Sequence, residues 1–435
     1  MLVVFIRVLI IYITVLVFLR LMGKRQIGEM QPYEVVITLI IADLATLPMS
    51  DSNIPLLHGL LPLGILVLLH YLITLLTRKN AKIRRIVCGQ PIVVISPNGL
   101  EYQAFKDLNI TIDDISEITA VGHRVVQGGS LFNKSVLIND EVVAGIESMN
   151  DLAPLHNPAN IMGINASIEL FGKDVPQVAV FDNAFHSTMP DEAYMFGIPY
   201  EYYEKYQIRR YGFHGTSHRY VSGECARIMG KDIKDLKIIT CHLGNGSSIT
   251  AIDGGKVIDT SMGLTPLDGF VMGTRSGNLD PSVVTFLQEK EGWSVAETNA
   301  VLNKRSGIAG ISGGFSDERD LQREANSGNK RADLARRMQW YQIRKYIGQY
   351  IAAMQGVDAI VFTGGIGENT FDLRADVCNN LSYLGVKLDD EANEIMRRGK
   401  EGEISTADSK VRVFVLPTNE ELVIARDTKA IVDAL

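Results

Sequence analysis

The 435-residue sequence has few cysteines and no excess of positive charge. Its four cysteines, Cys88, Cys225, Cys241 and Cys378, are scattered, and no two of them form a C-x-x-C pair. This spacing indicates neither a disulfide framework nor a zinc site, and it suits a reducing compartment. The formal net charge is −7, and the only basic block is a short one at 78–85. The composition therefore gives no support for nucleic-acid binding.

Charged residues make up 21% of the chain but are strongly depleted before Arg78. This part contains apolar runs at about 2–22, 33–49 and 54–76, which predict three transmembrane helices forming an anchor over 1–78. Basic residues follow the first and third runs, whereas the connection at 51–53 has none. The positive-inside rule then predicts an external N-terminus and a cytoplasmic remainder tethered to the cell membrane.

Beyond the apolar part, the stretch 236–263 predicts three strands joined by turns at Asn245-Gly246 and 253–255. Residues 244–248 read Gly-Asn-Gly-Ser-Ser and offer small side chains, backbone N–H groups and two hydroxyls. This composition favours a phosphate cradle, with an ordinary Asn-Gly hairpin as the alternative.

A second glycine-rich stretch follows a predicted strand at 359–362. Residues 363–367 read Thr-Gly-Gly-Ile-Gly and predict a tight turn leading into a helix over 371–381. A strand that enters a helix through glycines leaves unpaired N–H groups at the helix start, which suits a phosphate. Two such stretches together indicate a nucleotide held at both ends, whereas a turn that only connects is the alternative for the second.

The remaining pattern is that of alternating strands and helices. It predicts a hairpin over 136–146 turning at 139–141, a helix at about 160–170, and a strand at 178–181 that ends at Asp182. A helix over 331–354 has an apolar stripe that indicates a core or dimer contact rather than a cofactor site. A strand at 411–416 and a closing helix complete the chain.

Five motifs are similar to those of the acetate kinases. They are CHLGNGSS at 241–248, RRYGFHGTSH at 209–218, FDNAFH at 181–186, GTRSG at 273–277 and TNEE at 418–421. The resemblance covers 117–435 and implies an α/β, actin-like ATPase fold of two ribonuclease H-like halves that close on ATP. The first half would comprise 117–181 with 418–435, the second 182–417, and the family resemblance also implies a homodimer.

The resemblance implies a reversible, Mg²⁺-dependent phosphoryl transfer from ATP to acetate that gives ADP and acetyl phosphate. Such transfer needs positioning and positive charge, and a carboxylate acceptor is already ionised at neutral pH. The family pattern makes Asp182, His214 and Arg275 catalytic, Arg124 the ligand of the substrate carboxylate, and Glu420 a magnesium ligand. The implied ATP contacts are His242, Leu243, Gly244, Asn245, Gly246, Asp317, Glu318, Arg319, Gly365, Ile366, Gly367, Glu368 and Asn369.

Residues 1 to about 115 resemble the N-terminal part of the YetF-like bacterial membrane proteins, on motifs at 20–29, 47–51 and 89–95. Residues 79–116 would then be a cytoplasmic linker, with the join near Ser116. The acetate kinase family opens with an Asn-x-Gly-Ser-Ser-Ser hairpin that has no match before Arg124, so we expect a truncated first half. Two alternatives remain: a propionate or butyrate kinase, and a catalytically inactive or artefactual fusion carrying a kinase remnant.

Overall fold

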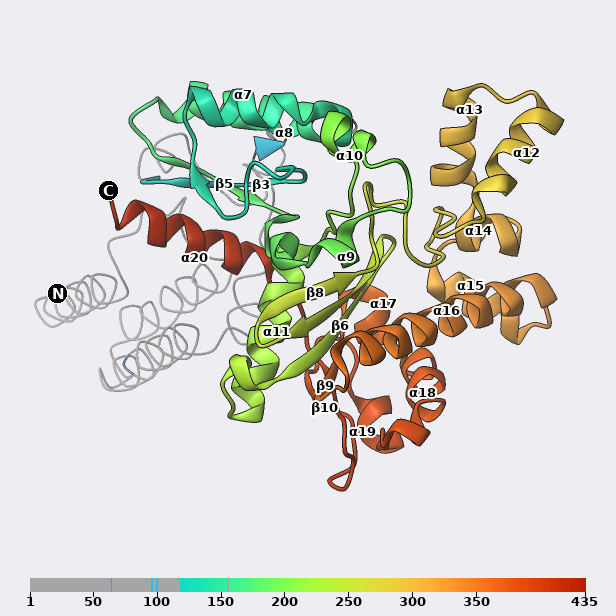
Figure 1. Ribbon diagram of the computed structural model, residues 1–435. Coiled ribbons are helices and arrows are strands. Elements are labelled where there is room, and N and C mark those ends of the chain that lie inside the picture. Colours follow the sequence, from blue (N-terminus) through green and yellow to red (C-terminus); the bar gives the residue numbers. More distant parts are fainter. Residues whose placement is uncertain (1–63, 65–94, 97–98, 101–117, 155) are drawn as a thin grey trace, which may run out of the picture. The chain divides into compact units, whose positions relative to one another are not determined.

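The computed structural model describes residues 64, 95–96, 99–100, 118–154 and 156–435 (Figure 1). By its contacts the chain divides into two units, Met1–Glu117 and Ile118–Leu435. In the first unit, strands β1 (Ile95–Ser96) and β2 (Gly99–Leu100) pair antiparallel. The predicted membrane spans, except for Gly64, lie outside the described residues, as does most of the YetF-like segment. Among the described residues, no helix combines the length and the hydropathy needed to span a bilayer.

The second unit begins with a three-stranded sheet. Strand β5 (Gln177–Phe181) lies between β3 (Val121–Val125), which is parallel to it, and the short antiparallel β4 (Val136–Leu137). Helices α7 (Asp140–Ser148) and α8 (Asn157–Phe171) lie on one face of this sheet, and the C-terminal helix α20 (Glu420–Val432) lies on the other (Figure 1). The last helix of the chain therefore packs against β3 and β5, which lie near the start of the second unit.

The predicted hairpin over 136–146 is wrong, because the chain enters a helix directly after β4. The Asn139 side chain caps that helix, α7, by accepting a hydrogen bond from the Val142 backbone N–H. Asp140 and Glu141 then fall in the first helical turn, where acidic side chains favour the helix dipole. Asn, Asp and Glu in sequence thus form a helix start here, although the same residue types also suit a turn.

The larger sheet has six strands in the order β10-β11-β9-β6-β7-β8. Its centre is parallel, since β9 (Ala359–Thr363) lies between β6 (Lys237–Leu243) and β11 (Arg412–Val415). Both edges are antiparallel: β7 (Ser247–Asp253) and β8 (Lys256–Thr260) on one side, and β10 (Gly402–Glu403) on the other. The chain therefore has the expected α/β fold with mixed sheets, and both turns predicted within 236–263 are confirmed.

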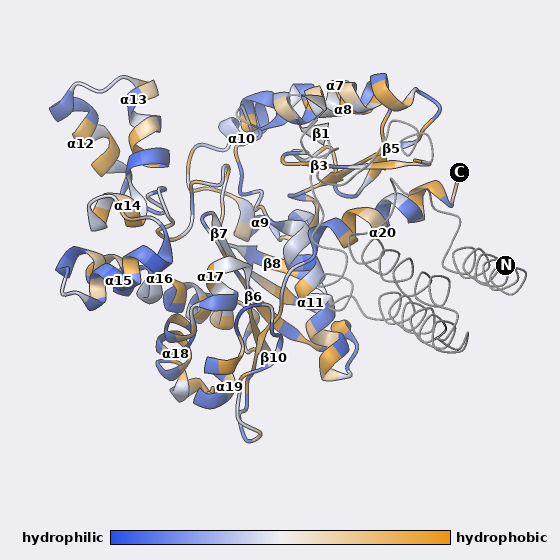
Figure 2. Cartoon of the chain, turned by 180° about the vertical axis from the view of Figure 1, so that it is seen from behind, coloured by the Kyte–Doolittle hydropathy of each residue, from blue (hydrophilic) through white to orange (hydrophobic). Residues whose placement is uncertain are grey.

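Helices cover both faces of this sheet, as the alternation of apolar side chains along its strands requires. Ile239 and Cys241 pack with α16 (Lys330–Met354) and α18 (Phe371–Asn379), whereas Ile238 packs with α11 (Gly215–Met229). In Figure 2 the strands carry mainly the hydrophobic colour, and the covering helices carry both colours. The sheet is thus the buried middle layer of three.

The long predicted helix is confirmed as α16, and its stripe is part of the core. Ile343 and Ile347 are fully buried, and Trp340 and Ile351 pack against the same cluster. The other α-helices of the second unit are α9 (Asp191–Tyr194), α10 (Glu201–Tyr206), α12 (Pro281–Glu291), α13 (Val295–Ala300), α14 (Gly307–Ser312), α15 (Glu318–Asn326), α17 (Gly364–Asn369) and α19 (Asp390–Ile395). Short helices at 150–152, 184–188, 233–235, 301–305 and 382–384 connect them.

Candidate active site

Most of the candidate residues stand at the carboxyl ends of strands, where α/β sheets place their ligands. Asp182 follows β5, and His242 and Leu243 end β6. Glu420 begins α20, a few residues after β11 ends. Asp182 is delivered by the smaller sheet, and His242 and Glu420 by the larger one, so residues far apart in the chain meet at an edge formed by strand ends of both sheets.

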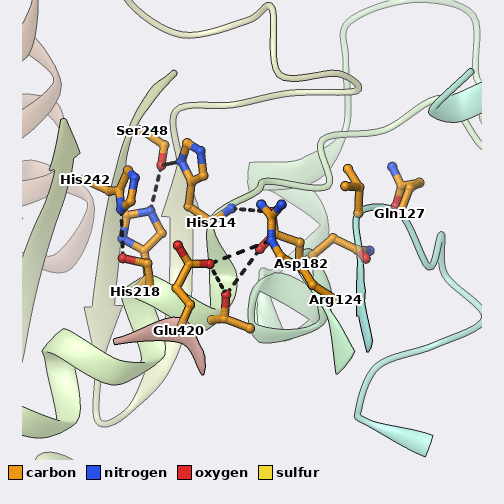
Figure 3. A network of polar contacts seen from close by, with 12 residues as sticks. Arg124, Gln127, Asp182, His214, His218, His242, Ser248 and Glu420 are labelled. Atoms are coloured by element: carbon orange, nitrogen blue, oxygen red, sulfur yellow. Dashed lines mark hydrogen bonds and ion pairs between the residues drawn. The ribbon is translucent and has the colours of Figure 1, made fainter. Parts of the chain in front are cut away.

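Arg124, Asp182 and Glu420 form a charged group at this edge (Figure 3). Arg124 Nη2 donates to Asp182 Oδ2 at 2.8 Å, and Arg124 Nε lies 3.7 Å from Glu420 Oε2. The Thr216 hydroxyl donates to the same Glu420 oxygen at 2.6 Å. The Arg124 side chain remains 42% exposed whereas that of Asp182 is 1% exposed, so the guanidinium has N–H groups available to a ligand.

The electrostatics of this group are those of two carboxylates sharing one cation. Burial, followed by the negative charge of Asp182, raises the pKa of Glu420 above its ordinary value. Asp182 in turn raises the pKa of Arg124, which keeps the guanidinium charged. A second cation beside the two carboxylates would relieve their repulsion.

The backbone N–H of His214 connects this residue to the charged group. It adopts the left-handed conformation, with φ of 59°, at the residue that precedes α11. Its backbone N–H donates to Asp182 Oδ2 at 3.0 Å. Asp182 therefore binds the Arg124 guanidinium and fixes the turn that presents the His214 ring.

The His214 ring belongs to a cluster of three histidines, of which His218 is fully buried and the other two are partly buried. It stacks on the His242 ring with centroids 4.2 Å apart, and its Nδ1 lies 2.9 Å from Ser248 Oγ. Burial lowers the pKa of His242 to about 4, and burial together with the neighbouring histidines holds the pKa of His214 well below 6.5. His218, bound to Ser248 from the other side, is lowered in the same way. The rings are thus neutral at pH 7.

Arg275 approaches the predicted phosphate turn. A side-chain carbon at Gly246 would lie 3.2 Å from Arg275 Nη1 and 3.7 Å from His214 Nε2. A carbon at Gly273 would lie 2.1 Å from Asn245 Oδ1, so a side chain there would displace the Asn245 amide. The structure therefore brings Arg275, His214 and Gly246 together, although the motifs that carry them are separate in the sequence.

The turn offers backbone groups rather than hydroxyls. The Ser247 hydroxyl donates to Gly244 O at 2.9 Å, and Ser248 Oγ bonds to the two histidines. Both hydroxyls of the predicted phosphate cradle are therefore bonded within the protein. The small side chains at 244–246 still leave the backbone approachable.

The second glycine-rich stretch forms the short helix α17 rather than a tight turn. Gly364 has φ of +78°, and a side-chain carbon there would lie 2.7 Å from Leu243 O. A carbon at Gly367 would lie 3.6 Å from Cys241 O, so α17 begins against the end of β6. The two glycine-rich stretches are therefore neighbours. Within α17, Asn369 bonds to Gly365 O, Glu368 bonds to the Gly364 N–H, and Ile366 packs on the core.

Residues 317–319 are not joined to the other candidates by any hydrogen bond or ion pair among the described residues. Asp317 caps α15 and pairs with Arg319, which is 90% exposed. Glu318 points inward, where its Oε1 accepts from Arg336 Nε at 3.0 Å. Burial raises the pKa of Glu318 to about 7 despite that partner. The inward Glu318 side chain is thus not available to a nucleotide.

Sequence reasoning missed several residues that support the site. Thr216 and Ser217 stand within a motif singled out above, but their contacts to Glu420 and to His242 Nδ1 depend on the fold. Arg374 is completely buried and donates to Gly367 O at 2.8 Å. A lone arginine in a helical segment gives no signal of such a role.

The described residues contain no group of three or more His, Cys, Asp or Glu side chains arranged to hold a metal ion. Mg²⁺, however, is commonly bound through one or two carboxylates together with substrate phosphates and water. Asp182 and Glu420 offer such a pair, because both carboxylates contact Arg124 and the Thr216 hydroxyl. The acidic residues therefore fit a magnesium ion of this kind.

The chain matches known proteins over its second unit and slightly beyond. The model of the acetokinase family matches residues 97–426, beginning ahead of the kinase-like part expected from Glu117. The acetate kinase of Thermotoga maritima is 60% identical over 325 residues, which are 74% of this chain and 80% of the relative. That of Carboxydothermus hydrogenoformans is 59% identical over 319 residues, 73% of this chain and 79% of the relative.

Solved structures agree with these relatives. The acetate kinase of Porphyromonas gingivalis superposes with a TM-score of 0.71 at 51% identity, covering 73% of this chain and 79% of that one. A propionate kinase from Francisella tularensis gives the same TM-score at 45% identity, covering 77% and 85%. With this fold and these matches, the chain belongs to the acetokinase family, a family of phosphotransferases.

Proposed function

We propose that this chain catalyses the reversible transfer of the γ-phosphoryl group of ATP to acetate, giving ADP and acetyl phosphate. The observation that carries the proposal is the meeting of Arg124, Asp182, His214 and Arg275 beside the glycine-rich turn at 244–246. Cationic and N–H donors gathered around one point are what a transferring phosphoryl group requires.

The acceptor carboxylate needs a cation and no base. Arg124 is the proposed ligand, because its guanidinium stays charged and is 42% exposed. Asp182 orients that guanidinium and holds the backbone N–H of His214. Since acetate is already ionised at neutral pH, Asp182 acts through position rather than by removing a proton.

Arg275 and His214 are the proposed donors to the phosphoryl oxygens. Arg275 Nη1 and His214 Nε2 both lie beside Gly246. An arginine that stabilises the charge of a transferring phosphoryl group is typically worth about 10³ to 10⁵ in rate. Burial lowers the pKa of Arg275, but arginine remains charged at neutral pH.

Glu420, with Asp182 nearby, is the proposed holder of magnesium. When bound, the ion neutralises charge on the phosphate oxygens. Glu420 Oε2 is oriented by the Thr216 hydroxyl, so the carboxylate is fixed before a ligand arrives. The proposed nucleotide contacts are 242–246 and 365–369, supported by the contact of α17 with β6, and 317–319 through their exposed side chains or backbone.

The test is ATP-dependent formation of acetyl phosphate by the purified full-length chain, trapped with hydroxylamine. We expect activity in the wild type and a loss of at least about 10³-fold in Arg275→Ala. Arg337→Ala is the matched control, because Arg337 is exposed and, in the part of the chain that the structure describes, its ion pair is with Asp333 on its own helix. Absence of activity in the wild type would favour the inactive fusion instead.

A longer acyl chain is the second candidate substrate, because one structural relative is a propionate kinase. Val126, Phe213, Met262 and Met272 form an apolar cluster that begins two residues after Arg124. Comparing kcat/KM for acetate, propionate and butyrate decides the question. A preference for propionate or butyrate would refute the acetate assignment.

The finer architecture and the partners extend this proposal. We assign 117–181 with 418–435 to a first, truncated ribonuclease H-like half and 182–417 to the second, in an actin-like arrangement.

A homodimer is supported by the exposed apolar side chains on and beside α12 and α13, which are Leu279, Val283, Phe286 and Val295. The apolar sequence at 2–22, 33–49 and 54–76 supports a membrane tether. Sedimentation of the detergent-purified chain tests the dimer, and fractionation of cells tests the tether.

A further inference from the structure

The stacked rings of His214 and His242 share one feature, which is that Nδ1 of each ring forms a hydrogen bond with a serine hydroxyl. His214 Nδ1 lies 2.9 Å from Ser248 Oγ, and His242 Nδ1 lies 2.8 Å from Ser217 Oγ. An imidazole has two nitrogens, so only Nε2 of each ring is left for a ligand. Which of the two nitrogens carries the proton is fixed by the partner of the other.

For His214 that partner belongs to a longer chain of contacts (Figure 3). Ser248 Oγ also lies 2.7 Å from His218 Nε2, and His218 Nδ1 lies 2.7 Å from Thr240 Oγ1. Thr240, His218 and Ser248 are all completely buried. Each neutral ring has one N–H and one lone pair, and a hydroxyl has one proton, so a Ser248 hydroxyl that donates to His214 fixes the proton positions along the rest of the chain.

The surroundings of His214 Nε2 determine the direction in which these protons point. His214 Nε2 faces the turn at Gly246, beside Arg275 Nη1, as the distances from a carbon at Gly246 show. An anionic phosphoryl oxygen at this point is attracted by an N–H and repelled by a lone pair. A proton on Nε2 leaves His214 Nδ1 as an acceptor, which requires the Ser248 hydroxyl to donate.

We propose that Thr240, His218 and Ser248 form a relay of hydrogen bonds that holds His214 as the Nε2-protonated tautomer. The Thr240 hydroxyl donates to His218 Nδ1, His218 Nε2–H donates to Ser248 Oγ, and the Ser248 hydroxyl donates to His214 Nδ1. Thr240 and Ser248 are thus positioning residues for phosphoryl transfer. This inference rests on the proposed function only for the identity of the anion.

The neighbouring strand supplies a matched control. Thr250 stands opposite Thr240 in the β6–β7 pair and is equally buried. Its hydroxyl, however, bonds to Thr260 Oγ1 at 2.8 Å and to His186 Nε2 at 3.3 Å, outside the relay. Replacing Thr250 removes at least as many buried hydrogen bonds as replacing Thr240, without touching the chain that ends at His214.

The kinetic test compares Ser248→Ala with Thr250→Val in the full chain. We expect kcat to fall about tenfold in Ser248→Ala, with KM for ATP and for acetate changed less than about twofold, because the serine acts on the reacting step through His214. Thr250→Val is expected to keep kcat within about twofold of the wild type. Equal losses of kcat in both variants would mean a structural role and would overturn the relay.

The spectroscopic test needs no turnover. Nitrogen-15 spectra of the histidine-labelled chain distinguish the two tautomers, and the His214 signals are those lost in His214→Asn. We expect His214 protonated on Nε2 in the wild type, with the other tautomer appearing in Thr240→Val. A wild-type His214 protonated on Nδ1 overturns the relay whether or not the variants fold. An inactive chain with the expected tautomer would refute the proposed function and support the relay.

Discussion

Arg374 offers the sharpest test of how the core supports the second glycine-rich stretch. Its guanidinium is completely buried and makes four hydrogen bonds. They go to Asn393 Oδ1 at 2.8 Å and to the carbonyls of Gly367 at 2.8 Å, Asn393 at 2.7 Å and Met396 at 2.8 Å. Arg374 thus ties α17, at the second glycine-rich stretch, to α18 and to the end of α19.

The contribution of Arg374 to the free energy of unfolding is the difference between two opposing effects. Hydrogen bonds from a charged donor contribute about 1.5 kcal/mol or more each, so four contribute roughly 6 kcal/mol. Against this, burial of the guanidinium lowers its pKa from 12.5 to about 10. This lowering of the pKa corresponds to a cost of roughly 3 kcal/mol for burying the charge. We therefore expect Arg374→Met, which fills a similar volume, to lose about 3 kcal/mol of the free energy of unfolding.

The assay is urea unfolding followed by tryptophan fluorescence, since Trp340 packs against the same core cluster as Leu373 and Val377. The control is Arg337→Met, whose exposed ion pair with Asp333 is worth at most about 1 kcal/mol. A loss in Arg374→Met no larger than in the control would refute the reasoning, because it would mean that the desolvation cost cancels the hydrogen bonds.

Three further predictions concern single residues. Gly364→Ala should lose about 2 kcal/mol of stability in urea unfolding, because φ is +78°, whereas Gly348→Ala, in the open middle of α16, should gain about 0.5 to 1 kcal/mol. Burial lowers the pKa of His186 to about 4, so below pH 6.5 the folded chain binds fewer protons than the unfolded chain. The free energy of unfolding should therefore fall by roughly 3 kcal/mol between pH 6.5 and pH 4. In His186→Gln, the melting temperature should depend less on pH over this range. Glu420→Gln should raise the Mg²⁺ concentration for half-maximal acetyl phosphate formation about tenfold or more, and an unchanged requirement would place the metal elsewhere.

The sequence predicted elements well where a pattern is local. The strand at 359–362, the helix at 331–354 and the Asn-Gly turn at 245–246 all depend on neighbouring residues, and the structure confirms them. The hairpin over 136–146 failed for a local reason as well, because Asn139 suits a helix cap as much as a turn.

The supporting residues were missed because their roles depend on contacts distant in the sequence. Arg374 is recognisable only when the carbonyls of 367, 393 and 396 surround it. Ser248 stands in a glycine-rich stretch whose composition favours a phosphate cradle, but its hydroxyl contacts two histidines. The motifs indicated the candidate residues, while the orientation of each side chain required the fold.

The register of β6 and β7 connects the turn to the chemistry. His242 lies opposite Ser248, and Thr240 lies opposite Thr250, so these four side chains share the face that α11 covers. Along that face the far end is apolar, with Ile238 in the core, and the end near the start of α11 is polar. Side chains alternate between the faces of a sheet, so a slip of one residue would turn Ser248 away from His214 and His218. The turn at Asn245-Gly246, which joins β6 and β7, fixes this register. The same short loop therefore shapes the proposed phosphate site and positions the Ser248 hydroxyl that orients His214.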